Sequence, residues 1–152
     1  MSTLNGLPAH VLLVHAVVVL IPLTAALLIL CALWRAARSR LSWLVAVLAL
    51  GCLILTPITI RAGEWFENRL GNPPDVRHHA DLGATMTYFA VALFVGALLV
   101  LLVHWRESRG KSFAAPIVAV LAVLAIAAGV AATWQVYRVG DSGAHAVWGD
   151  RL

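Results

Sequence analysis

The chain has 152 residues, of which 62% are hydrophobic and only 12% are charged, and its net charge is +4. A soluble globular domain carries roughly 25% charged residues, so the composition excludes an ordinary soluble domain and indicates a chain whose solvent is mostly lipid. A membrane-spanning helix takes about 20 residues, which leaves space for four spans and no separate soluble domain, and no basic block with interleaved aromatic residues predicts a nucleic-acid partner.

Four apolar stretches follow one another, at about residues 9–34, 41–61, 80–105 and 113–138. Each is long enough to cross roughly 30 Å of hydrocarbon at 1.5 Å per residue. Apolar runs of this length without polar alternation do not fit the strands of a membrane barrel. The sequence therefore predicts an all-α fold, an integral-membrane four-helix bundle that forms a single domain over residues 1–152.

The charges between the spans predict an orientation. The short links at 35–40 and 106–112 each contain three basic residues, whereas the longer segment 61–81 carries one more acidic than basic residue. Basic residues in short loops favour the cytoplasmic side, and the start of the first span is uncharged. We therefore expect a multi-pass protein of the bacterial cytoplasmic membrane, with the lipid bilayer around it and both termini outside the cytoplasm.

Histidines are the most informative polar residues of the spans. His10 lies 24 residues from Trp34 and His79 lies 26 residues from Trp105. At helical rise this places both imidazoles roughly 36 to 39 Å above the inner interface, level with each other near the outer surface. His15 is about 7 Å deeper, in the hydrocarbon, where an ionisable side chain needs a partner.

Other polar residues are expected in the same outer layer and could orient these imidazoles: Glu64, Glu67, Asp81, Asp141 and His145. Imidazole binds haem iron, zinc or copper, and a neighbouring carboxylate fixes its tautomer. We therefore predict His10, His15 and His79 as ligands of a b-type haem or of another metal or redox centre. His10 and His15 lie about 140° apart around a helix, so depth favours the pair of His10 and His79.

The two ends of the chain resemble a bacterial membrane family known as domain of unknown function 2231. The likeness rests on the segment 7–15, which carries two histidines five residues apart, and on the tail 137–148, with Gly140, Ser142 and Gly143. His79 at the start of the third span also fits the family. Members are sometimes joined to Rieske-type or cytochrome c-type domains, so the resemblance implies a redox context in the membrane.

Two interpretations of function therefore stand side by side. The first is a protein of membrane electron transfer that holds haem b or a metal at its outer face. The second is a non-catalytic accessory or assembly subunit of a larger membrane complex, such as a respiratory complex, in which the histidines complete hydrogen bonds or lie solvated at the interface. The sequence shows no Ser/His/Asp triad, P-loop or dinucleotide motif, which favours a protein that is not an enzyme, and it leaves a homo-oligomer open.

Overall fold

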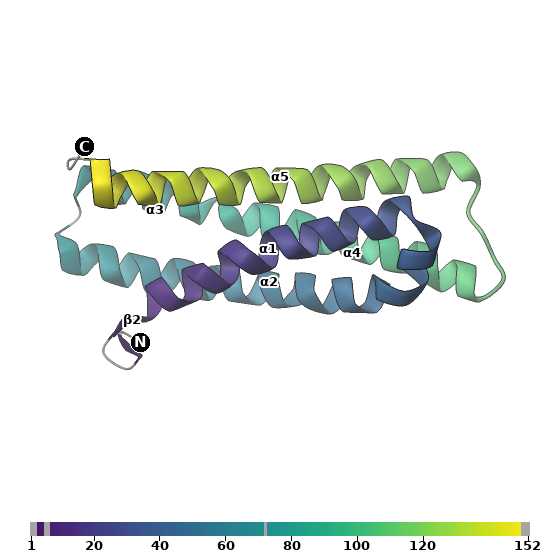
Figure 1. Ribbon diagram of the computed structural model, residues 1–152, viewed down its shortest axis with the longest axis horizontal. Helices are drawn as coiled ribbons and strands as arrows, with labels where there is room; N and C mark the ends of the chain where they lie inside the picture. Colours follow the sequence, from purple (N-terminus) through teal and green to yellow (C-terminus); the bar gives the residue numbers. More distant parts are fainter. Residues whose placement is uncertain (1–2, 5–6, 72, 150–152) are drawn as a thin grey trace.

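The computed structural model describes residues 3–4, 7–71 and 73–149. Two short strands at the start, β1 and β2, pair antiparallel, and five helices follow (Figure 1). The elements are β1 Thr3–Leu4, β2 Leu7–Pro8, α1 Ala9–Leu33, α2 Arg35–Leu70, α3 Pro74–Ala84, α4 Met86–Ser108 and α5 Ala115–Trp148. The prediction of an all-α fold is confirmed, because the paired strands are only two residues long.

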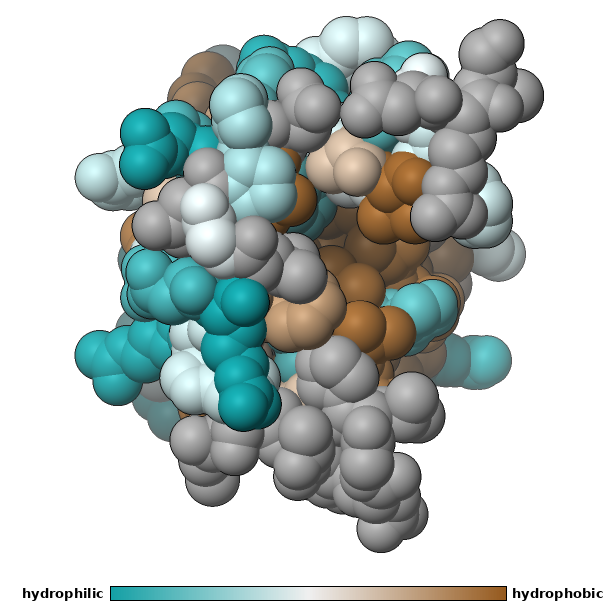
Figure 2. Space-filling view, turned by 90° about the vertical axis from the view of Figure 1, so that its left-hand side faces the viewer, coloured by the Kyte–Doolittle hydropathy of each residue, from teal (hydrophilic) through white to brown (hydrophobic). Residues whose placement is uncertain are grey.

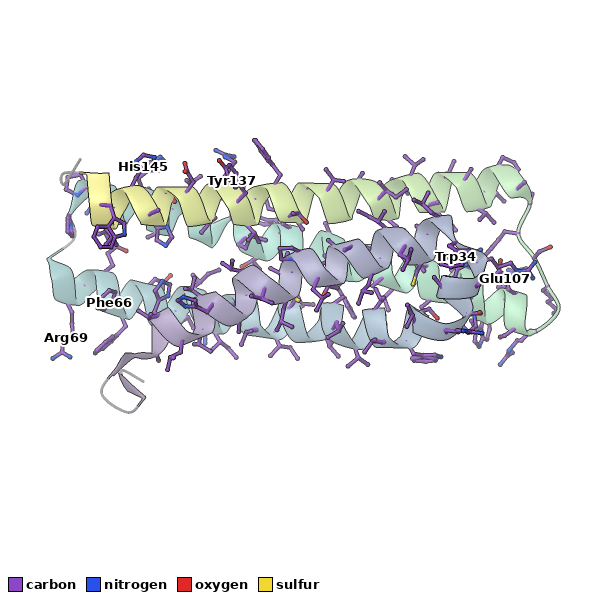
Figure 3. The ribbon with its side chains drawn as sticks, viewed as in Figure 1. Trp34, Phe66, Arg69, Glu107, Tyr137 and His145 are labelled. Atoms are coloured by element: carbon purple, nitrogen blue, oxygen red, sulfur yellow. The ribbon has the colours of Figure 1, made fainter. Side chains whose placement is uncertain are left out.

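The helices form one elongated bundle. α1 packs against α2 and α5, and α4 packs against the same two helices, so the order around the bundle is α1, α2, α4, α5. α3 lies against α5 and α2, at the end where α1 begins and α5 finishes (Figure 1). This end, which carries Phe66, Arg69 and His145, is called the histidine end, and Trp34 and Glu107 lie at the opposite end (Figure 3).

In the part of the chain that the structure describes, four segments are long and apolar enough to cross a membrane: Ala9–Leu33, Arg35–Arg69, Val76–Ser108 and Ala115–Trp148. Small residues let these helices approach closely, as at Gly96, where an added Cβ would lie 3.3 Å from the Cα of Ala125. The outward faces are apolar too, and side chains such as Val19, Val47 and Val123 are more than 60% exposed. An apolar core inside an apolar surface is the pattern of a bundle surrounded by lipid.

The first predicted link is wrong, because residues 35–40 are helical rather than a loop. α2 begins at Arg35, directly after Trp34. Arg38 is 7% exposed, and its guanidinium donates to the carbonyl oxygens of Cys31 and Ala32 and to both carboxylate oxygens of Glu107. Because the last carbonyl groups of α1 lack partners within the helix, Arg38 satisfies them and connects α1, α2 and α4.

The third predicted span is divided into two helices. It starts at Pro74, earlier than expected, and breaks at Thr85, where the hydroxyl group donates to the carbonyl oxygen of Leu82 at 2.7 Å. The buried amide of Gln135 on α5 donates to Thr85 Oγ1 at 2.7 Å and to Leu82 O at 3.3 Å. One buried side chain therefore holds the junction of α3 and α4 against α5 and fixes the position of α3.

Candidate functional site

The histidine end brings two imidazoles together from two helices. The ring centroids of His10 on α1 and His79 on α3 are 6.3 Å apart, and the ring planes meet at 77°. Both side chains are half-buried. Because depth along a helix follows from residue count, the prediction that these two residues lie level was available from the sequence, and it is confirmed.

His10 is held by α2. Its Nδ1 lies 3.1 Å from the carbonyl oxygen of Thr59, and since a carbonyl oxygen only accepts, Nδ1 carries the proton and donates. The ring lies against Gly63, where an added Cβ would stand 2.9 Å from Cε1 of His10. Gly63 is therefore the residue that leaves space for the imidazole on the surface of α2.

His79 is held by α5 in the same way. Its Nδ1 lies 3.0 Å from Ser142 Oγ, and the serine hydroxyl donates its own hydrogen to the carbonyl oxygen of Val139 at 2.8 Å. The serine oxygen therefore accepts, and Nδ1 of His79 donates. An added Cβ on Gly143 would stand 3.0 Å from Cε1 of His79, so a glycine again makes space for the ring.

These hydrogen bonds fix the tautomer of both rings. A neutral imidazole with its proton on Nδ1 has its lone pair on Nε2. Within residues 7–71 and 73–149, neither Nε2 atom has a hydrogen-bond partner. Histidines that bind metals usually donate their other ring N–H to a carbonyl or a similar acceptor, and both rings make a bond of this kind.

His15 does not join the pair. Its side chain is exposed on the outer face of α1, and its Nδ1 donates to the carbonyl oxygen of Val11 in its own helix at 2.6 Å. The angle of about 140° between residues five apart on a helix explains why His10 faces the bundle while His15 faces outward. The partner that we expect for a polar side chain in the hydrocarbon is, for His15, a carbonyl oxygen of its own helix.

The carboxylates predicted to orient the imidazoles do not do so in the part of the chain that the structure describes. Glu64 and Asp81 are exposed, and Glu67 is half-buried without a bond to either ring. Asp141 lies 3.9 Å from His145, with which it forms an exposed pair. The acceptors are the backbone of Thr59 and the hydroxyl of Ser142 instead, because these atoms lie on the helix faces that the histidines contact.

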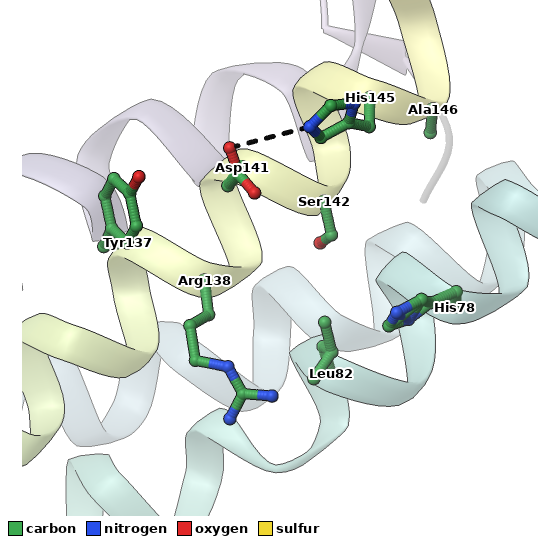
Figure 4. Close-up of a pocket in the computed structure, with 8 residues that line it drawn as sticks. All are labelled: His78, Leu82, Tyr137, Arg138, Asp141, Ser142, His145 and Ala146. Atoms are coloured by element: carbon green, nitrogen blue, oxygen red, sulfur yellow. Dashed lines mark ion pairs between the residues drawn. The ribbon is translucent and has the colours of Figure 1, made fainter. Parts of the chain in front are cut away.

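A cavity of about 410 Å³ opens beside the pair, between α3 and α5. Ser142 lines it and also binds His79, so the cavity and the histidine pair share one hydroxyl group. The other lining residues are His78, Leu82, Tyr137, Arg138, Asp141, His145 and Ala146 (Figure 4). The surface of the histidine end is also hollowed, with hydrophobic atoms at the base of the hollow and hydrophilic groups beside it (Figure 2).

The number of possible ligands at the histidine end limits the kind of metal centre that it could hold. Among the described residues no group of three or more His, Cys, Asp or Glu side chains is arranged to hold a metal ion. Zinc sites in proteins use three or four protein ligands, whereas a haem would need only one or two side chains as ligands.

Four residues of this site were not predicted as its parts: Thr59, Gly63, Ser142 and Gly143. A signal for two of them was present in the tail, where Ser142 and Gly143 follow each other in an otherwise helical segment. Thr59 acts through its backbone, and any residue type offers the same carbonyl group. Only the packing of α1 on α2 identifies it.

The family described as "Predicted membrane protein (DUF2231)" matches residues 6–152, which is nearly the whole chain. No curated protein and no solved structure matches the chain.

Proposed function

We propose that this chain, which belongs to the DUF2231 family of predicted membrane proteins, holds a b-type haem between His10 and His79 and takes part in electron transfer in the membrane. The observation that carries the proposal is the pair of imidazoles, whose ring centroids are 6.3 Å apart. In each ring Nδ1 donates a hydrogen bond, and Nε2 has no hydrogen-bond partner among the described residues. A haem bound there would supply one-electron redox chemistry.

The chain's own residues orient the ligands. Thr59 and Ser142 accept hydrogen bonds from Nδ1 of the two rings, which keeps the Nε2 lone pairs available and raises the basicity of both imidazoles. Gly63 and Gly143 let the imidazoles lie close to α2 and α5.

The test is a reduced-minus-oxidised absorption spectrum of the protein purified in detergent, together with metal analysis. We expect bands typical of a b-type haem, lost in H10A and in H79A. H15A and H104A are matched controls, because His15 faces outward and His104 lies at the opposite end, and both should keep the bands. A folded wild-type protein without colour or metal would overturn the proposal.

The rival function, an accessory or assembly subunit, predicts a different set of results. The protein would then co-purify with a respiratory complex, and H79A would leave both the association and the absorption spectrum of the complex unchanged. Association that is lost together with the haem bands would support the electron-transfer function, because the redox centre would then be required for the partner.

The proposal places the histidine end outside the cytoplasm of a bacterial cell, with α1 beginning and α5 ending there. It rests on the basic residues of the opposite end, among them Arg35, Arg40 and Lys111, which the positive-inside rule assigns to the cytoplasm. A fusion of alkaline phosphatase to the C-terminus should be active, and a fusion inserted after Gly110 should be inactive. The reverse result would contradict this orientation.

A further inference from the structure

The cavity between α3 and α5 has the size of a small-molecule site. Its volume of about 410 Å³ falls in the range of ligand pockets, roughly 300 to 1,000 Å³. Arg138 extends from α5 toward α3 beside Leu82, and His78 extends into the same space from α3 (Figure 4). Ser142 lies between them on α5. Two potential hydrogen-bond donors, Arg138 and His78, therefore converge on one space from two helices, and the hydroxyl of Ser142 already donates to Val139.

The guanidinium of Arg138 has most of its hydrogen-bonding capacity unused. Among the described residues its one bond goes from Nη1 to Oε1 of Gln135, at 3.4 Å, and it has no carboxylate partner within 4.0 Å. Arginine offers five N–H donors in a planar fork that matches the oxygen atoms of phosphate. The side chain is thus available to a ligand with two anionic oxygens.

The other charges of the cavity are compatible with an anion. Asp141 is its acidic residue, and it is directed toward His145, 3.9 Å away (Figure 4). His78 and His145 contribute additional N–H donors, and either gains positive charge when protonated. Asp141 remains a negative charge at the cavity and opposes an anion there, whereas Arg138 attracts it.

The apolar residues of the cavity point to its place in the membrane. Tyr137 lines it and stacks on Trp134, with ring centroids 5.6 Å apart, and both rings are more than 60% exposed. Exposed tyrosine and tryptophan side chains favour the level of the lipid headgroups. The oxyanion most abundant at that level is phosphate.

We propose that this cavity binds a phosphate group through Arg138, with His78 as a further donor. The phosphate group belongs either to the headgroup of an anionic lipid or to a soluble phosphate. The proposal does not rest on haem binding, and protein without any cofactor tests it. Ser142 connects the two sites, so an occupied cavity lies next to the hydrogen bond that orients His79.

Two titrations separate the sources of the phosphate. In the first, delipidated protein in a neutral detergent is titrated with phosphatidylglycerol, and native mass spectrometry counts the bound lipids. In the second, inorganic phosphate is titrated into the same protein, and calorimetry measures the affinity. Saturable binding of one lipid alone assigns a headgroup site, and binding of both assigns a site for phosphate itself. Binding of neither overturns the proposal.

Variants test whether Arg138 binds the ligand and whether the ligand is an anion. R138Q should weaken the affinity about tenfold or more, since it removes a charged and bidentate donor. R61Q is the matched control, because Arg61 is exposed on α2 and does not line the cavity. D141N should strengthen the affinity, since it removes the negative charge nearest to the phosphate.

D141N keeps the proposal falsifiable if R138Q fails to fold, because it changes an exposed residue and predicts a gain rather than a loss. Unchanged thermal unfolding, followed by tryptophan fluorescence, identifies the variants that fold. Binding that is unaffected by R138Q, or weakened by D141N, overturns the proposal.

Discussion

Gly63 of α2 lies directly against the imidazole of His10: a Cβ at this glycine would stand 2.9 Å from Cε1 and 3.0 Å from Nδ1 of the ring. The same ring donates to the carbonyl oxygen of Thr59, one helical turn away on α2. Together the glycine and the carbonyl fix both the position and the tautomer of His10. Gly143 and Ser142 of α5 do the same for His79 of α3.

The glycine at position 63 is therefore required for the site but not for the fold. In G63A the methyl group displaces the ring of His10 and breaks its bond to Thr59, because Cβ contacts below 3.0 Å are not tolerated. ¹⁵N NMR of protein labelled at histidine should show a changed Nδ1 signal for His10 only. G51A is the control on the same helix, since nothing lies within 4 Å of a Cβ there. An unchanged His10 signal in G63A would refute the role of this glycine.

The tautomer of His79 depends on Ser142. We expect the wild-type ¹⁵N spectrum to show His79 with its proton on Nδ1, and S142A to lose that preference because the accepting oxygen is gone. If haem is bound, S142A should also weaken its retention, by about tenfold to a hundredfold. S108A, whose hydroxyl binds only its own helix at the opposite end, should change neither measurement. A wild-type His79 protonated on Nε2 alone would contradict this prediction.

The junction of α3 and α4 depends on Gln135. Q135L removes the two hydrogen bonds to Thr85 and Leu82 at similar side-chain volume. We expect the free energy of unfolding, measured in mixed micelles with increasing dodecyl sulfate, to fall by about 1 to 2 kcal/mol. T133A, which removes only a hydroxyl bonded within α5, is the matched control and should cost less. Equal losses in the two variants would show that the junction does not depend on Gln135.

The opposite end depends on the buried ion pair of Arg38 and Glu107, whose side chains are 8% and 16% exposed. E107Q leaves the arginine without its counter-charge and should lower the free energy of unfolding by about 3 kcal/mol. The exchanged pair R38E/E107R should not restore stability, because a glutamate at 38 would face the carbonyl oxygens of Cys31 and Ala32.

R35Q is the control for this ion pair. Arg35 lies 3.8 Å from the same carboxylate, but its side chain is 78% exposed, so its removal should cost less than about 1 kcal/mol. Chemical unfolding followed by tryptophan fluorescence measures all three variants. Full rescue by the exchanged pair would show that the hydrogen bonds to α1 contribute little and that only the charges matter.

The sequence by itself determined the four spans, the all-α fold and the level pairing of His10 with His79. The all-α fold follows from long apolar runs without polar alternation. The lengths of the spans and the level pairing follow from the distance along a helix axis, which is the residue count multiplied by a constant rise. The angular separation of His10 and His15 follows from the same regular geometry. It explains why only one of the two histidines of α1 faces the bundle.

Only the tertiary structure decided which side chains meet across helices. The order α1, α2, α4, α5 places Gly63 under His10, and the packing of α3 on α5 places Ser142 and Gly143 beside His79. The same packing turned the expected basic loop at Arg38 into a buried contact. Lateral neighbours depend on the packing of all helices together, and no local pattern of residues specifies that arrangement.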